Sequence, residues 1–385
     1  MLIVGGGIIG LATAYQMLEL WPDVEVTVLE KNADLAQEQS GHNSGVLHAG
    51  LYYTPGSAKA RLAVAGIREM TAFCRDHDIA HEICGKLVVA TTDAEIPRLR
   101  TLFERGTRNG LAGLRWLNAS EAHAIEPAVR AVAAVHVPEE GIVDYPAVCR
   151  ALAKCITSRG GRVVLNARVE ALRPSWVAET PVGVFEGDLL INCAGLYCDR
   201  IARMAGASID VRIIPFRGEY FVLEPERRHL VRHLIYPVPD PAFPFLGVHF
   251  TRHIDGGIEA GPNAVLALDM PEGRAALAYP GLWRFIAKYP KVCAEELWRS
   301  GSRRLFARKL SRLVPDIRAG DLAPGGAGVR AQAMRPNGSF VEDFLFAEQP
   351  GALHLLNAPS PGATASLAIG REIVARLQPA LTHAA

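Results

Sequence analysis

Three glycines near the N-terminus constrain the fold of this chain more than any other feature. They follow a short apolar strand predicted over residues 2–4 and begin a helix that the sequence pattern extends to about residue 20. In a G-x-G-x-x-G turn the first glycine permits the tight turn, the second lets the backbone approach a pyrophosphate, and the third lets the helix pack on the strand. Gly5, Gly7 and Gly10 have this spacing, and the helix N-terminus behind them offers free N–H groups to phosphates.

A second strand, predicted over residues 24–30, completes a βαβ unit. It ends at Glu30, where an acidic side chain binds a ribose hydroxyl in dinucleotide-binding folds. We add the neighbouring Lys31, and Val169 further along the chain, to the expected cofactor contacts. The pattern predicts a dinucleotide site, and a tight strand-to-helix turn without a ligand is the alternative.

Three further segments favour a flavin over a nicotinamide as the dinucleotide. Residues 40–50 read SGHNSGVLHAG, and such small residues let the backbone approach a flat ring and its polyol chain closely. A strand predicted over residues 188–193 ends in small residues, and a turn before a predicted C-terminal helix, residues 364–377, presents the positive end of the helix dipole to an anion. The cofactor contacts expected from these segments are Gly41, Asn43, Ser44, Gly45, Val46, Ala194, Gly195, Gly362, Ala363 and Thr364.

Length and composition set broader limits. A chain of 385 residues favours two lobes, and a net charge of +1 gives no electrostatic reason to expect nucleic acid. The seven cysteines are scattered without metal-ligand spacing, so we expect reduced thiols and no metal. The glycine motif begins at the fifth residue and no run approaches the roughly 18 apolar residues of a membrane span, so a cytoplasmic location is expected.

The remaining pattern predicts an α/β protein whose cofactor domain is interleaved with a second domain. Helices are expected over residues 57–77, 99–108, 145–159 and 276–314 (interrupted at Pro280 and Pro290), with a short helix over 120–125 capped by Ser120; strands are expected over residues 86–90, 163–165 and 353–356. Residues 211–258 alternate apolar and polar positions and contain Pro237, Pro239, Pro241 and Pro244, which is typical of antiparallel strands and loops. We therefore expect a Rossmann-like FAD-binding domain from residues 1–80, 140–210 and 325–385, and an α+β substrate domain with an antiparallel sheet from residues 81–139 and 211–324.

The chain also resembles a known family along nearly its whole length. Residues 40–62, which read SGHNSGVLHAGLYYTPGSAKARL, and residues 357–366, which read NAPSPGATAS, look like signatures of L-2-hydroxyglutarate oxidases and dehydrogenases. Shorter matches occur at residues 85–87, 141–145, 217–221, 246–252, 261–267 and 328–332.

This resemblance implies FAD, the oxidation of L-2-hydroxyglutarate to 2-oxoglutarate, and electron transfer to a quinone or to oxygen. The cysteine that carries covalent flavin in some relatives of sarcosine oxidase has no counterpart near residue 330, so noncovalent FAD is expected. The alternatives are an amino acid or amine oxidase, a glycerol-3-phosphate dehydrogenase on the same scaffold, or a non-redox FAD-binding module. Fold alone does not decide between them.

Oxidation of a 2-hydroxy acid needs a base for the hydroxyl proton, and histidine has a suitable pKa. His48 lies in the small-residue loop expected to face the flavin, and His249 lies on a strand expected to cover it. We expect His249 to act as the base and His48 to contact the flavin or the substrate.

A dicarboxylate also needs cations, and the planar guanidinium group matches a carboxylate best. Related flavin oxidases place the arginine of a G-x-R motif over the flavin, which assigns the α-carboxylate to Arg330. The candidates for the distal carboxylate are the cations Lys59, Arg217 and Arg252 and the hydroxyls of Tyr220 and Tyr236.

One further segment suggests contact with an anionic membrane. Residues 302–313 read SRRLFARKLSRL, which places Arg304, Arg308 and Arg312 on one stripe of a helix and Leu305, Phe306, Leu310 and Leu313 on another. Trp283, Phe285 and Trp298 lie just upstream, and such aromatic residues settle at the lipid headgroup layer. The alternative is an ordinary helix packed on its own domain.

Overall fold

The computed structural model describes residues 1–240, 247–300 and 302–382. Pro241, Pro244 and Leu246 lie outside the described residues. Across the described ranges, no helix combines the length and the apolar character needed to cross a membrane.

A six-stranded sheet carries the N-terminal glycine motif. Its order is β20–β21–β13–β1–β2–β9, and all neighbours are parallel except β20 and β21. The strands come from distant parts of the chain: β1 (Leu2–Val4), β2 (Thr27–Leu29), β9 (Arg162–Val164), β13 (Leu190–Asn192), β20 (Leu345–Gln349) and β21 (Ala352–Asn357). The central strands β1, β13 and β21 are wholly buried, as expected for parallel strands covered on both faces.

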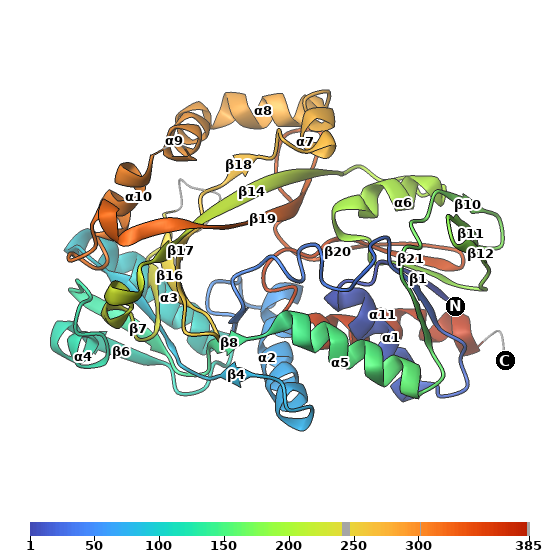
Figure 1. Ribbon diagram of the computed structural model, residues 1–385, viewed down its shortest axis with the longest axis horizontal. Helices are drawn as coiled ribbons and strands as arrows, with labels where there is room; N and C mark the ends of the chain where they lie inside the picture. Colours follow the sequence, from blue (N-terminus) through green and yellow to red (C-terminus); the bar gives the residue numbers. More distant parts are fainter. Residues whose placement is uncertain (241–246, 301, 383–385) are drawn as a thin grey trace.

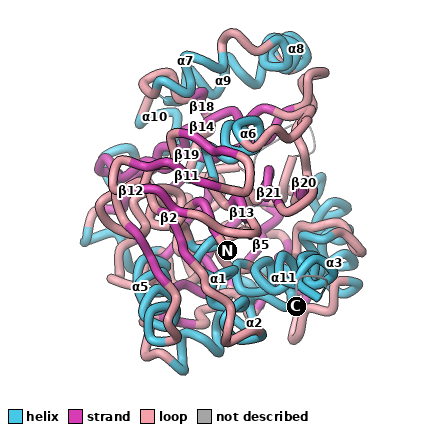
Figure 2. Tube along the Cα trace, turned by 90° about the vertical axis from the view of Figure 1, so that its right-hand side faces the viewer, coloured by secondary structure: helices cyan, strands magenta, loops and turns pink. Residues whose placement is uncertain are grey.

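Helices gather below this sheet in Figures 1 and 2. They are α1 (Ile8–Leu20), α2 (Ala58–Asp76), α5 (Tyr145–Ser158) and α11 (Ser366–Thr382), and α1 packs between α5 and α11. The close approach of α11 to α1 depends on Gly370, because a Cβ atom there would lie 2.8 Å from the Ala12 carbonyl oxygen. The predicted βαβ unit and C-terminal helix are therefore confirmed as elements, although α11 begins two residues later than expected.

A second, nine-stranded sheet has the order β18–β14–β17–β16–β15–β5–β7–β6, with β19 paired to β14. Its strands are β5 (Lys86–Ala90), β6 (Arg115–Asn118), β7 (Ala133–Val137), β14 (Arg212–Leu223), β15 (Leu234–Pro237), β16 (His249–Arg252), β17 (Ile258–Gly261), β18 (Val265–Leu266) and β19 (Leu322–Met334). The expected antiparallel sheet is present, but β15 pairs in parallel with β5.

The longest strands, β14 and β19, form a ribbon that arches over the centre of the molecule (Figure 1). The sequence analysis missed β19. Its first half contains Pro324, Gly325, Gly326 and Gly328, a composition that normally indicates a loop. Pairing with the β-branched and aromatic residues of β14 overrides that local preference.

Helices α7 (Pro271–Ala276), α8 (Pro280–Lys288), α9 (Pro290–Ser300) and α10 (Arg303–Leu310) follow one another above the ribbon (Figures 1 and 2). Pro280 and Pro290 start new helices as predicted. The helical segment expected over residues 276–314 begins earlier, because Pro271 fits the first turn of α7, and its last helix ends at Leu310. Two other expected helix starts were also wrong. Helix α3 (Ile96–Arg108) begins before residue 99 because Pro97 fits its first turn, and α4 (Ala119–Ile125) is capped by Asn118, in a capping box with Glu121, rather than by Ser120.

Two small sheets and one further helix complete the fold. Strands β3 (Val46–Leu47), β8 (Gly141–Val143) and β4 (His81–Glu82) form one sheet, and β10 (Ala171–Arg173), β11 (Val177–Thr180) and β12 (Gly183–Phe185) form the other. Helix α6 (Cys198–Met204) lies beside the six-stranded sheet (Figure 1). The pairing of β3 with β8 holds the His48 loop against the turn that carries Glu140.

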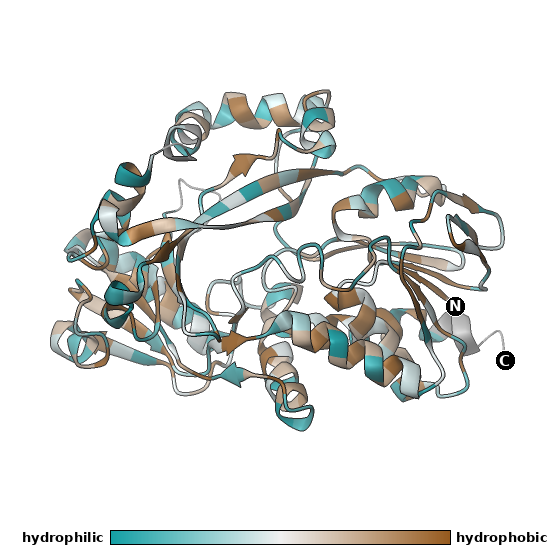
Figure 3. Ribbon diagram, in the orientation of Figure 1, coloured by the Kyte–Doolittle hydropathy of each residue, from teal (hydrophilic) through white to brown (hydrophobic). Residues whose placement is uncertain are grey.

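One apolar core joins the two large sheets. Its buried members include Ile3 and Met17 around the six-stranded sheet and Val88, Val135 and Tyr236 in the nine-stranded sheet. Figure 3 shows brown, hydrophobic residues concentrated in the central strands of the six-stranded sheet and in the helix next to them. The division into two interleaved domains stays a prediction, and its boundary at residue 325 falls inside β19.

Candidate functional site

A cavity of about 870 Å³ lies between the two large sheets. This volume falls in the range of small-molecule and cofactor sites. Its walls come from the glycine turn after β1, the segment 36–48, the end of β13, the β14–β19 ribbon and the turn before α11. Most of the sequence-predicted site residues line it: Gly5, Gly7, Glu30, Lys31, Asn43, Ser44, Val46, His48, Lys59, Val169, Ala194, Gly195, Tyr220, Tyr236, His249, Arg330, Gly362, Ala363 and Thr364.

The glycine turn is built for close approach. Gly5 has a φ of +107°, and a Cβ atom on Gly10 would lie 1.9 Å from the Gly5 carbonyl oxygen, so both positions require glycine. The Glu30 carboxylate accepts hydrogen bonds from the Gly6 N–H at 2.9 Å and the Asn32 N–H at 2.8 Å. Glu30 thus holds the turn together and still lines the cavity, where its oxygens have further acceptor capacity.

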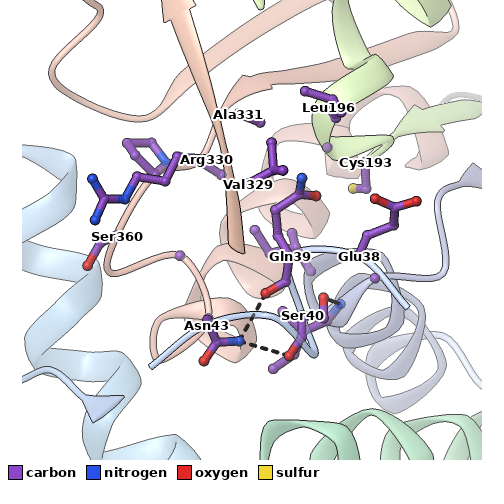
Figure 4. A pocket seen from close by; sticks show the side chains of 18 of the residues that line it. Glu38, Gln39, Ser40, Asn43, Cys193, Leu196, Val329, Arg330, Ala331 and Ser360 are labelled. Carbon is purple, nitrogen blue, oxygen red and sulfur yellow. Dashed lines mark hydrogen bonds between the residues drawn. The ribbon is translucent and has the colours of Figure 1, made fainter. Parts of the chain in front are cut away.

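The small-residue loop is stabilised by its own polar side chains (Figure 4). The Asn43 amide donates to the carbonyls of Gln39 at 3.0 Å and Ser40 at 2.8 Å, and its oxygen accepts from the Gly45 N–H. Gly41 does not line the cavity, because it packs where a Cβ atom would lie 2.0 Å from the Ala36 carbonyl oxygen. Gly10, Gly41 and Gly45 therefore shape the cofactor walls from behind.

The C-terminal turn lies directly against this loop. The Thr364 hydroxyl accepts the His48 backbone N–H at 3.1 Å and lies 2.8 Å from the hydroxyl of buried Tyr145. Asn357 has a structural role, because its side chain accepts a hydrogen bond from the Ala333 N–H and donates to the carbonyls of Val341 and Asp343. The turn therefore connects the loop, helix α5 and strand β19 at one side of the cavity.

Four side chains from the nine-stranded sheet and the turn after β7 meet around His48. Its Nδ1 atom lies 3.3 Å from Lys86 Nζ and 3.7 Å from Glu140 Oε2, and Lys86 and Glu140 form a fully buried ion pair. The Tyr236 ring lies under the Lys86 ammonium group, 4.2 Å from its centroid to Nζ, and stacks on the His249 ring at 3.8 Å. The site therefore brings together the two predicted histidines and an ion pair that the sequence analysis did not assign.

The two histidines have different electrostatic surroundings. Burial lowers the pKa of His249 to about 3; the Gly247 carbonyl, 2.7 Å from Nδ1, opposes the shift, and the cations Lys86 and Arg330 add to it. Burial and the Lys86 ammonium group also lower the pKa of His48, but there the Glu140 carboxylate opposes them. Of the two imidazoles, His48 has the carboxylate that stabilises a protonated ring.

Cationic and phenolic side chains line the same cavity. Arg330 extends from β19 on the side of Ser360 (Figure 4) and stands next to Tyr220, where burial raises the pKa of the phenol and the guanidinium group opposes this shift. Lys59 lies in the first turn of α2, where the helix dipole disfavours a cation. Burial lowers the pKa of Lys59 to about 8 against the opposing carboxylates of Asp343 and Glu342.

Two predicted substrate contacts lie elsewhere among the described residues. Arg217 forms an ion pair with Asp269 at 2.6 Å, and Arg252 forms one with Glu82 at 2.9 Å. Neither arginine lines the large cavity. For Arg217 the reason is strand alternation: successive side chains of β14 point to opposite faces, and it is the neighbouring position, Phe216, that pairs with Arg330 of β19.

The lining and supporting residues that the sequence analysis missed include Tyr52, Tyr53, Lys86, Arg105 and Glu140. For Lys86 a signal exists, because a lysine that begins a short apolar strand is exceptional. The others carry no local signal. Within the described ranges, no group of three or more His, Cys, Asp and Glu side chains is arranged for a metal ion, and all seven cysteines are free.

The residues present fit a flavin dinucleotide. The glycine turn after β1 and Glu30 line part of the cavity. The β14–β19 ribbon packs closely on the small-residue loop, because a Cβ atom on Gly328 would lie 2.4 Å from the His42 carbonyl oxygen. The Tyr52 hydroxyl is buried without a hydrogen-bond partner among the described residues, as expected beside a ligand.

Comparison with known proteins agrees with this geometry. The family described as FAD dependent oxidoreductase matches residues 1–376. The chain is 48% identical to an L-2-hydroxyglutarate dehydrogenase from Indibacter alkaliphilus, covering 96% of each chain, and 43% identical to one from Escherichia coli, covering 98% of this chain and 92% of the relative. A solved structure of dithionite-reduced L-alpha-glycerophosphate oxidase from Mycoplasma pneumoniae, with FAD bound, has a TM-score of 0.77 and 26% identity, covering 98% and 94%. The predicted FAD cofactor and fold class are confirmed, and the chain belongs to the FAD-dependent oxidoreductase family.

Proposed function

We propose that this protein oxidises L-2-hydroxyglutarate to 2-oxoglutarate. The observation that carries the proposal is one cavity that presents two histidines together with two cations, Arg330 and Lys59, from different elements. A dicarboxylic 2-hydroxy acid needs these groups: a base for its hydroxyl and a cation for each carboxylate. The substrate named for the relatives at 43–48% identity agrees with this chemistry.

FAD in this cavity supplies the acceptor for the hydride that leaves C2 of the substrate. The chain itself must remove the hydroxyl proton, and the contacts favour His48 over His249 for this step. The Nδ1 atom of His48 lies near both Lys86 and Glu140. With the ring proton on Nδ1, directed at the Glu140 carboxylate, Nε2 is the proton acceptor, and the carboxylate stabilises the protonated ring. This reverses the preference drawn from the sequence. His249, held neutral by burial and neighbouring cations, then serves to orient the substrate.

Arg330 is the proposed partner of the α-carboxylate, with Tyr220 beside it. Lys59 is the proposed partner of the distal carboxylate, because Arg217 and Arg252 are paired away from the cavity. Tyr236 forms the wall behind His249. We also propose that FAD is held noncovalently, since the thiols lining the cavity, Cys193 and Cys198, are buried and have raised pKa values.

Anaerobic titration of the purified flavoprotein tests the function. L-2-Hydroxyglutarate is expected to bleach the oxidised flavin absorbance, whereas glycine, sarcosine and glycerol 3-phosphate are expected to leave it unchanged. Bleaching by one of those three compounds and not by L-2-hydroxyglutarate would replace the proposal with an amine oxidase or a glycerol-3-phosphate dehydrogenase.

The electrons are proposed to pass to a quinone at an anionic membrane surface. The predicted amphipathic helix does not support this, because Phe306, Leu310 and Leu313 are buried in the protein's own core and α10 ends before Arg312. Phe285 is buried as well. What supports the proposal is the exposure of Trp283 (55%) and Trp298 (75%) on α8 and α9, with exposed Arg304 and Arg308 on the next helix.

A further inference from the structure

A lysine stands at a place in the fold where lysine is rarely found. Lys86 begins β5, pairs with Val137 on one side and Leu234 on the other, and is 0% exposed. The four residues that follow it in the strand, Leu87–Ala90 in sequence order, are all buried and apolar. An ammonium group in such surroundings is strongly disfavoured unless it is paired.

Its partner is equally buried. Glu140 is 0% exposed and follows β7, the strand next to β5. One carboxylate oxygen, Oε1, accepts the Ala49 N–H at 3.1 Å, and the other, Oε2, contacts both Lys86 and the Nδ1 side of His48. The ion pair is therefore attached to the loop that carries His48, immediately beside it.

Stability alone gives no reason for this pair. Buried ion pairs are often replaced by apolar residues without loss of stability, because desolvation offsets their attraction. Burial alone would raise the pKa of Glu140, yet Lys86 and His48 outweigh it and hold that pKa at about 2. Burial also lowers the pKa of Lys86, and the Glu140 carboxylate opposes that shift. Glu140 is thus held ionised at the point where His48 would gain a proton.

We propose that Lys86 and Glu140 are positioning residues for His48: Lys86 keeps the Glu140 carboxylate ionised, Glu140 holds the ring proton on the Nδ1 side, and Nε2 is left unprotonated as the acceptor of the substrate proton. This inference rests on the proposed function of His48 as the base. The Lys86 ammonium group disfavours protonation of the His48 ring, and the Glu140 carboxylate favours it. Together they keep His48 uncharged before the reaction and able to accept a proton during it.

The other titratable side chains near His48 are tyrosines, a histidine and an arginine. Tyr52 and Tyr236 present their rings to Lys86, and their pKa values are raised by burial, so both remain neutral. His249 and Arg330 line the same cavity, and both Arg330 and His48 lower the pKa of His249. Glu140 is the carboxylate in direct contact with the His48 ring.

The test uses the oxidised, FAD-loaded protein without substrate, labelled with ¹³C and ¹⁵N in histidine. The resonance of His48 is assigned by its loss in His48→Gln. Lys86→Met removes the cation and is expected to raise the titration midpoint of His48, whereas Glu140→Gln removes the carboxylate and is expected to lower it, each by about 1 pH unit or more. Glu140→Gln keeps an acceptor for the Ala49 N–H, so the loop contact is preserved.

The acid limb of the pH profile of kcat/KM reports the pKa of the base in the free enzyme. It should therefore move to higher pH in Lys86→Met and to lower pH in Glu140→Gln. Glu126→Gln is the matched control: Glu126 is also fully buried and binds a histidine, His233, at 2.9 Å, but it does not line the cavity. This control is expected to leave the His48 titration unchanged.

If a single variant does not fold, the double variant Lys86→Met/Glu140→Gln removes both charges and is examined instead. Its ¹⁵N shifts are expected to show His48 as a mixture of tautomers, whereas the wild type shows one. Shifts in the same direction for both single variants, or a single tautomer in the double variant, would overturn the inference. If the titration behaves as expected while L-2-hydroxyglutarate fails to bleach the flavin, the positioning pair stands and only the proposed substrate is wrong.

Discussion

The hydroxyl of Thr364 accepts a hydrogen bond from the backbone N–H of His48 at 3.1 Å, although 316 positions separate the two residues in the chain. The same hydroxyl contacts the Val46 carbonyl and the Tyr145 hydroxyl. This contact joins the small-residue loop to the turn before α11 and fixes the backbone on which His48 stands. The position of the proposed base therefore depends on both ends of the chain.

His48→Gln is expected to lower kcat by roughly 10²–10⁴-fold while FAD stays bound, because a general base contributes about that much. His249→Gln is expected to raise KM more than it lowers kcat, since its ring is neutral and orients the substrate. Steady-state kinetics and the flavin spectrum of each variant measure both effects. If His249→Gln shows the larger loss in kcat, the two roles must be exchanged.

Arg330→Lys is expected to raise KM for L-2-hydroxyglutarate, because an ammonium group cannot replace the two parallel hydrogen bonds of a guanidinium. Arg330→Ala should lower kcat/KM by about 10–100-fold or more, given about 1.5–3 kcal/mol for a charge-assisted hydrogen bond. Arg217→Ala serves as the control, since Arg217 is ion-paired outside the cavity, next to the strand position that faces Arg330. Equal losses in both variants would contradict the assignment of Arg330.

The pKa of Lys59, lowered by burial to about 8, predicts a dependence on pH. Below this value the side chain is an ammonium group that can bind the distal carboxylate, and above it the charge is lost. We therefore expect kcat/KM for L-2-hydroxyglutarate to fall as pH rises through about 8, and this limb to disappear in Lys59→Met. A 2-hydroxy acid without a distal carboxylate is the matched substrate, and the same limb with that substrate would point to another group.

Acid precipitation should release all of the flavin into the supernatant, because no covalent link is expected. Flavin that stays with the precipitate would disprove noncovalent binding.

Gly5→Ala should abolish FAD retention, since its Cβ atom would lie 2.4 Å from the Cys193 carbonyl oxygen and its φ of +107° disfavours any L side chain. Gly183→Ala is the control, because Gly183 also has a positive φ but has open space around it.

Anionic vesicles should co-sediment the protein at low salt and release it as salt rises. Trp298→Ala and Trp283→Ala together are expected to weaken this binding, because these rings are the most exposed aromatic surface of the α7–α10 layer. Arg304→Glu with Arg308→Glu should reduce it further. A wild-type protein that stays in the supernatant at low salt would remove the membrane proposal.

The sequence by itself determined the βαβ unit, the FAD cofactor and most of the walls of the cavity. Gly5, Gly7 and Gly10 occupy backbone positions that only glycine fits. Because their spacing is fixed by the strand-turn-helix geometry, the spacing in the sequence predicts that geometry. The same local logic found Lys86–Ala90 as a strand and predicted helix interruptions at Pro280 and Pro290, where α8 and α9 begin.

The tertiary structure alone decided which side chains meet. Lys59 and Arg217 were both candidates for the distal carboxylate in the sequence, but the fold turns Arg217 to Asp269 and leaves Lys59 in the cavity. Strand β19 forms only because β14 offers it a partner, despite its glycines. The ion pair of Lys86 and Glu140 behind His48 was not predictable for the same reason: contacts between residues 38 to 91 positions apart depend on how the sheets assemble, and no local pattern records that.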